Sequence, residues 1–145
     1  MTDIVVTAAN VLLNQGSLNA QRNCAGVVSQ GDVVSLDASN KWVAAQSDVS
    51  ALIAGTNGIA IALNTTSADA QPLTVVESGA KVAYGTGVLA AGETYVVSSA
   101  AAGGIAPIGD LAAGDFTVIV GYAEDTSILV IQPVVTNLAR GTAVT

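Results

Sequence analysis

The chain has 145 residues, no histidine, one cysteine, and 11 acidic against 4 basic side chains, for a formal net charge of −7. Without histidine, no histidine-based catalytic pair or metal centre can be built, and a lone cysteine cannot form an internal disulfide. The basic residues are scattered, so the chain lacks the basic surface that nucleic-acid binding requires. We therefore expect no enzyme activity, no catalytic residue, no metal ligand, no cofactor and no nucleic-acid partner.

Short β-branched runs, separated by turn residues roughly every eight to twelve positions, indicate an all-β fold. Glycine paired with Asp, Asn or Glu fills the turns, as in Gly31-Asp32 and Asn57-Gly58. We predict a single compact β-barrel or β-sandwich. The predicted strands cover residues 4–7, 27–28, 33–36, 42–45, 58–63, 73–76, 81–84, 94–98, 117–123 and 128–131.

The two ends of the chain set the domain boundaries, because the N-terminal residues are β-like and the C-terminal residues lack a period. Residues 1–10 form an N-terminal arm that could add a strand to its own sheet or to a neighbour's. Residues 11–135 form the β domain, in which 15–22 is a predicted surface loop and 46–55 a short helix or turn. Residues 136–145 show no periodicity and form a C-terminal tail.

Two parts of the β domain are similar to each other in sequence. The segment Gly31-Asp32-Val33-Val34-Ser35 recurs as Gly92-Glu93-Thr94-Tyr95-Val96-Val97-Ser98. Gly58-Ile59-Ala60 recurs as Gly121-Tyr122-Ala123, 63 residues later. Because biased composition inflates such matches, two pseudo-repeats and a chance likeness both stay open.

The chain is poor in charged residues and rich in apolar ones, since only 10% of the residues are charged and the mean hydropathy is +0.60. A soluble monomer usually carries more charge, so we expect partners to cover part of the exterior. Trp42 is either a core residue or an interface anchor, since tryptophan is enriched at binding hot spots. The other candidate partner-binding residues lie in the arm and the tail: Asp3, Ile4, Val5, Val6, Leu138 and Arg140.

No uncharged stretch is long and continuous enough to predict a membrane-spanning helix, because Gly, Asn and Pro interrupt the candidates at 49–68 and 126–139. We therefore expect no membrane partner. The N-terminus lacks the basic and apolar parts of a signal peptide. The sequence therefore predicts a protein made in the cytoplasm and not exported.

Several turn-and-strand motifs together resemble small structural proteins of tailed bacteriophages, of the capsid decoration (cement) type. The resemblance implies a β-barrel-like protein in the virion, on the outer capsid surface, where it binds the major capsid protein and stabilises contacts between capsomers. It also implies a homo-oligomer, with a trimer favoured. The motifs are Thr7-Ala8-Ala9-Asn10-Val11, Gly31-Asp32-Val33-Val34, Gly58-Ile59-Ala60-Ile61-Ala62-Leu63-Asn64, Ala70-Gln71-Pro72-Leu73-Thr74-Val75, Gly92-Glu93-Thr94-Tyr95-Val96-Val97-Ser98 and Gly103-Gly104-Ile105-Ala106-Pro107.

Two alternatives remain at this stage. The first is another virion component, such as a head-fibre base or a tail or baseplate protein. The second is a carbohydrate-binding β-module, which would need exposed aromatic rings. The chain offers five aromatic side chains for that purpose: Trp42, Tyr84, Tyr95, Phe116 and Tyr122.

Overall fold

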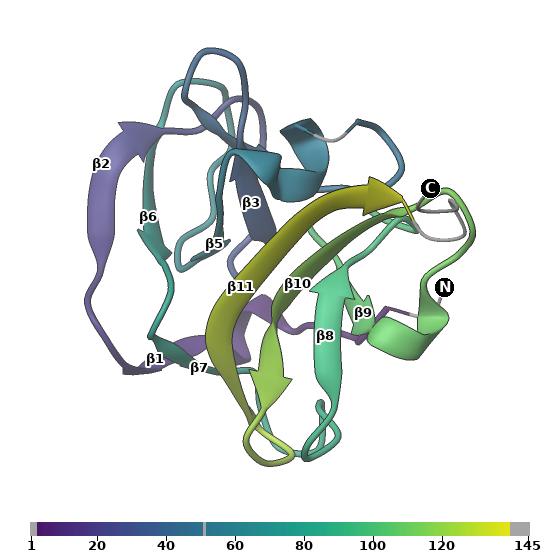
Figure 1. Cartoon of the computed structure of the whole chain (residues 1–145). Helices are drawn as coiled ribbons and strands as arrows, with labels where there is room; N and C mark the ends of the chain where they lie inside the picture. The colour runs from purple at the N-terminus through teal and green to yellow at the C-terminus, as the bar shows by residue number, and fades with distance from the viewer. Residues whose placement is uncertain (1–2, 51, 140–145) are drawn as a thin grey trace.

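The computed structural model describes residues 3–50 and 52–139 and confirms the all-β prediction, with two antiparallel sheets that form a β-sandwich (Figure 1). Sheet A has six strands in the order β1-β7-β11-β10-β8-β9, and sheet B has five in the order β2-β6-β5-β3-β4. The strands are β1 (Leu12–Gln15), β2 (Asn19–Asn23), β3 (Val33–Leu36), β4 (Trp42–Ala44), β5 (Ile59–Ala62), β6 (Pro72–Val76), β7 (Lys81–Ala83), β8 (Thr94–Val97), β9 (Ile105–Pro107), β10 (Phe116–Ala123) and β11 (Ile128–Ala139). Three short helical segments complete the described elements: η1 (Ala8–Asn10), η2 (Leu52–Thr56) and η3 (Ile108–Asp110).

Eight of the ten predicted strands coincide with observed strands, and two do not. The predicted strands at 4–7 and 27–28 are wrong, because both segments are irregular. The predicted surface loop at 15–22 is also wrong in part, because β2 begins at Asn19. As an edge strand that exposes most of its side chains, β2 needs no alternating apolar residues, so hydrophobic periodicity cannot reveal it.

The two ends of the chain are more structured than an arm and a tail. Ile4 N–H donates to the carbonyl of Ile105 at 2.9 Å, and the side chains of Ile4 and Val6 pack against the main core. At the other end, β11 continues to Ala139, so residues 136–139 of the expected tail belong to a strand. Backbone pairing with β10, including Phe116 with Ala139, accounts for this extension.

Buried side chains form two separate clusters. The main cluster lies between the sheets and combines residues of sheet B, such as Ile61, with Tyr84, Tyr95 and Leu129 from the side of sheet A. The second cluster lies on the other face of sheet B. Sheet B therefore buries both of its faces, and its central strand β5 is buried at every position.

The internal sequence similarity corresponds to a repeated strand topology. The strand order β2-β6-β5-β3-β4 in sheet B is reproduced in sheet A as β7-β11-β10-β8-β9, five strands later in the chain. The turns before β3 and β8 also make the same bonds. Gly31 N–H donates to Ala62 O at 2.8 Å and Ala62 N–H to Asp32 O at 2.9 Å, while Gly92, Ala123 and Glu93 make the equivalent pair at 2.8 and 2.9 Å.

The predicted spacing of 63 residues between the two repeats holds in one part of the fold and not in another. That offset holds between β4 and β9, which begin at Trp42 and Ile105. At the turns before β3 and β8 the offset is 61 residues, as the pairs Gly31 and Gly92 show. The register shift of β10 near Val120, between Ile119 and Gly121, is one place where the second repeat departs from a simple copy.

Candidate interaction surface

The Tyr84 and Asp32 side chains, whose pKa values the fold raises, make structural contacts. The Tyr84 hydroxyl, fully buried, donates to the carbonyl of Gly31 at 3.3 Å. Burial raises the pKa of Tyr84, and the negative charge of Asp32 adds to the effect. Burial also raises the pKa of Asp32, against the lowering effect of the hydrogen bond from Ser29 N–H. Both side chains stabilise the turn that precedes β3.

The described residues contain no cluster of three or more Cys, Asp or Glu side chains that could hold a metal ion. They also contain no helix long and apolar enough to cross a membrane.

The outer face of sheet A carries an unusual set of exposed apolar side chains. On β11, Leu129 and Ile131 point into the main core, so their neighbours Ile128, Val130 and Val134 point outward. Strand pairing then places other residues beside them. The rows are Leu12 with Ala83 and Ile128, Lys81 with Val130 and Tyr122, and Ile119 with Val134.

We call this set, made of Leu12, Ile119, Tyr122, Ile128, Val130 and Val134, the sheet A face. Leu12 is 61% exposed, Tyr122 42% and Val134 48%, and the other three are partly buried. In Figure 1, β11 and β10 lie side by side on one flank of the molecule, next to β8. Towards the β8 end, η3 lies against β8 and bounds the face.

Polar groups at the sheet A face are few and balanced. The Lys81 ammonium forms an ion pair with Glu124 at 3.1 Å, which neutralises the cation of this face. Gln132 is exposed between Ile131 and Pro133. Beside Leu12 and Ala83, the surface is hollowed by a shallow pocket of about 570 Å³, also lined by Asn10, Gly85 and Thr86. The face is therefore apolar, neutral and hollowed at one edge.

The outer face of sheet B is covered by the protein's own chain. After β2, the chain turns across the end of the sheet, and Cys24 forms a parallel bridge with Trp42 of β4, the opposite edge strand. Ala25 N–H donates to Trp42 O at 2.7 Å. Sheet B thereby curls back on itself, and Cys24 and Val28 seal the second cluster.

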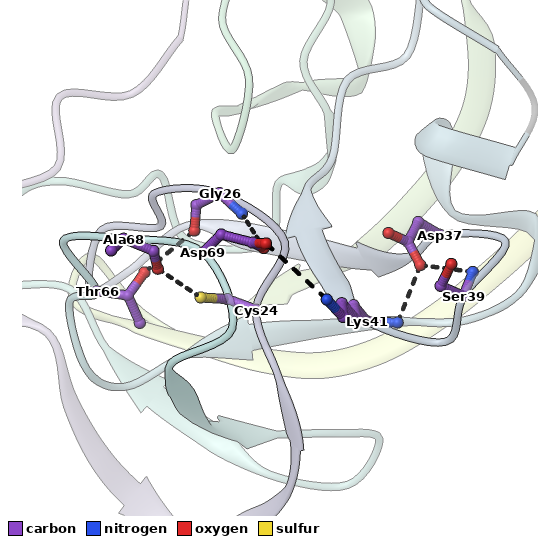
Figure 2. Close-up of polar contacts among 8 residues, drawn as sticks. All are labelled: Cys24, Gly26, Asp37, Ser39, Lys41, Thr66, Ala68 and Asp69. Carbon is purple, nitrogen blue, oxygen red and sulfur yellow. Dashed lines mark hydrogen bonds and ion pairs between the residues drawn. The ribbon is translucent and has the colours of Figure 1, made fainter.

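A seam of polar contacts fixes this covering segment (Figure 2). Gly26 N–H donates to the Asp69 carboxylate at 3.2 Å, and the Cys24 thiol donates to Ala68 O at 3.3 Å. Asp69 also lies 4.0 Å from the Lys41 ammonium. Val28 N–H donates to the Thr66 hydroxyl at 3.0 Å, so the loop between β5 and β6 fastens the segment along its length.

The second repeat makes the corresponding arrangement around the main cluster. In the repeated order of strands, Tyr84 follows β7 as Cys24 follows β2, and Leu89 takes the place of Val28. Tyr84 and Leu89 both pack into the main cluster between the sheets, not onto the outer side. Ala62 of the second cluster likewise corresponds to Ala123 of the main cluster, so the covered face of sheet B matches the core face of sheet A. The sheet A face, with Tyr122, matches instead the face of sheet B that carries Ile61 in the main core.

The predicted partner-binding residues lie elsewhere. Trp42 is 3% exposed in the second cluster, which gives it the core role and removes it from the surface. The Asp3 carboxylate accepts a hydrogen bond from the Ser98 hydroxyl. Ile4 and Val6 are partly buried on the main core, whereas Val5 is 84% exposed.

The two remaining predicted residues are at the C-terminal end. The backbone of Leu138 belongs to β11, and its side chain is not described. Arg140 lies outside the described residues. Among the described side chains, the structure does not bring the arm residues and Trp42 together, because they join different clusters.

Sequence reasoning missed the sheet A face. A signal was available in β10 and β11, where nearly every position between Val118 and Val135 outside the turn is apolar or small. Such continuous apolar strands are expected to be buried on both faces. Only the structure shows that one of those faces is open. Comparison with protein-family models, curated proteins and solved structures finds no match to this chain.

Proposed function

We propose that this chain is a virion structural protein, a capsid decoration protein that binds the outer surface of a phage capsid and stabilises contacts between capsomers. The observation that carries the proposal is the sheet A face, an apolar and neutral surface on a small acidic β-sandwich. Contiguous exposed apolar side chains mark interaction surfaces. The resemblance in the turn-and-strand motifs supplies the capsid as the setting and the major capsid protein as the partner.

The mechanism in this proposal is passive. A decoration protein adds many copies of a modest contact to a shell, and the free energy of each contact is released only when the capsomers are correctly placed. The net charge of −7 suits a position outside the shell, because a packaged genome repels an acidic protein. The same proposal includes self-association, with a trimer expected.

The carbohydrate-binding alternative receives less support from the aromatic side chains. Trp42, Tyr84 and Tyr95 are buried, and Phe116 is partly buried against the main core. Tyr122 is the one of the five that is substantially exposed. A single ring offers a small platform for a sugar.

The proposal is tested by adding the purified chain back to capsids that lack it. We expect the chain to co-sediment with the shells at a fixed stoichiometry and to raise their melting temperature. A capsid whose melting temperature is unchanged at saturating chain would contradict a cementing role. Binding to the tail or to a single vertex would move the protein to another part of the virion.

A further inference from the structure

We propose that the edge of sheet A beside β9 is a binding site for an extended peptide segment, and that the N-terminal segment, residues 3–6, occupies it as a detachable strap. The inference does not depend on the capsid setting. Its starting point is a matching position in the two repeats. Leu36 of β3 pairs with Trp42 at the start of β4. Val97 of β8 pairs in the same way with Ile105 at the start of β9.

The carbonyl groups at these two positions take their hydrogen bonds from different parts of the chain. Trp42 O accepts the N–H of Ala25, in the covering segment that follows β2. Ile105 O accepts the N–H of Ile4 at 2.9 Å, from a segment outside the strand order of both sheets. The first repeat therefore closes this edge with its own chain, and the second closes it with the N-terminal segment. Addition of an extended segment to a sheet edge is a known mode of peptide recognition.

The second repeat has space for the carboxylate of this segment. Gly104 precedes β9 as Lys41 precedes β4, so the second repeat has no side chain where the first has a lysine. The φ of Gly104 is not in the left-handed region, so its backbone does not require glycine. A Cβ atom there would collide with the Asp3 carboxylate, which accepts a hydrogen bond from the Ser98 hydroxyl. The glycine at position 104 is therefore explained by the segment that docks on it.

The apolar contacts of the segment alternate, as in an extended chain. Ile4 and Val6 pack against the main core, and Val6 also lies against Gly31 in the turn before β3. Val5, between them, is 84% exposed. The site therefore accepts a carboxylate followed by two apolar side chains that alternate with an exposed one. Release of the segment breaks no pair between the strands of the two sheets, so it can open locally while the β domain stays folded.

The tether makes the segment a competitor for its own site. A short flexible tether gives an effective concentration of about 1 mM. With a Kd of about 0.1 mM for the segment, the site is open in about one-tenth of the molecules, and a separate peptide binds about tenfold more weakly than to an open site. A substitution that weakens docking of the segment should therefore strengthen binding of the same peptide added in solution.

The test is an NMR titration of the isotope-labelled full-length chain with a synthetic peptide of residues 1–9. The open-site variant combines Ile4→Asp with Val6→Asp, because charged side chains do not dock on an apolar core. We expect this variant to stay folded and to bind the peptide at least fivefold more tightly than the wild type does. The amide signals of Gly104 and Ile105 should shift. The peptide that carries both Asp substitutions is the matched control and should not bind.

A milder pair of variants compares neighbouring residues of the segment. Ile4→Ala removes contacts with the main core, whereas Val5→Ala shortens an exposed side chain. We expect Ile4→Ala to bind the added peptide at least threefold more tightly than the wild type, and Val5→Ala to bind it within twofold of the wild type. A merely structural role of Ile4 would not improve peptide binding, so the sign of this change separates the two roles.

Any of four results would overturn the inference. Unfolding of the double variant would make the segment an inseparable part of the β domain. Absence of peptide binding to every variant at about 2 mM would mean that the edge is not a binding site. Ile4→Ala that binds no more tightly than the wild type would remove the competition, and shifts away from β9 would place the site elsewhere. None of these results bears on the decoration role, which is tested on shells.

Discussion

Ionisation of the Asp32 carboxylate couples the folding stability of the chain to pH. Its carboxylate accepts a 2.9 Å hydrogen bond from Ser29 N–H, lies against Gly103, and is largely withdrawn from water. Burial raises its pKa in the folded state. A raised pKa contributes stability that is fully present below the unfolded-state pKa of about 3.9 and is lost as the pH rises through the folded-state value.

This linkage predicts the behaviour of Asp32→Asn. The amide oxygen can still accept the bond from Ser29, and the amide carries no charge to bury. We expect the variant to gain stability relative to wild type as the pH rises above about 4, and to show little difference below about pH 3. Urea unfolding at a series of pH values measures the gap. A gap that stays constant with pH would refute the role assigned to this carboxylate.

Gly121 is required by the close approach of β10 and β11. A Cβ atom at this position would collide with the carbonyl oxygen of Val130, which is backbone and cannot rotate away. We expect Gly121→Ala to lower the free energy of unfolding by at least about 2 kcal/mol. Gly109 is the matched control, because a Cβ there meets nothing within 4 Å and its φ is not positive.

For Gly109→Ala we expect a change within about 0.5 kcal/mol. Chemical denaturation of the two variants is sufficient to compare them. Equal effects at both glycines would show that the close approach of β10 and β11 does not restrict the residue at position 121.

The N-terminal segment docks on the β domain through some of its residues and exposes others. Because Ile4 packs on the main core and Val5 is exposed, neighbouring residues should respond differently to the same truncation. We expect Ile4→Ala to cost about 1–2 kcal/mol of stability and Val5→Ala less than about 0.5 kcal/mol. Thermal unfolding distinguishes them. Equal costs would mean that the segment is not docked on its own domain.

The seam of polar contacts that holds residues 24–28 over sheet B is the second element. Asp69 accepts from Gly26 N–H beside the buried Cys24, so removing its carboxylate should let the covering segment open more often. We expect Asp69→Ala to speed labelling of the Cys24 thiol by Ellman's reagent several-fold. Asp125→Ala is the control, since Asp125 bonds Ser127 and Ile128 N–H in the turn between β10 and β11. Faster labelling in both variants would place the opening outside the seam.

At the scale of the whole molecule, the strand-forming centres and the repeat were predictable because apolar alternation and turn chemistry are local. The segments around Val33, Ile59 and Leu73 carry both signals, and they form β3, β5 and β6. The burial of Trp42 and the docking of Ile4 depend on contacts between segments distant in the chain. The open sheet A face was not predictable for the same reason, because which side of β11 is covered is decided by where Tyr84 and Leu89 pack.

The proposed function makes this chain a repeated structural component of a virion. The most direct measurement is its copy number relative to the major capsid protein in purified virions, by quantitative mass spectrometry. We expect a ratio near one, or a fixed simple fraction of one that matches a set of capsid symmetry axes. Absence of the chain from purified virions would contradict it.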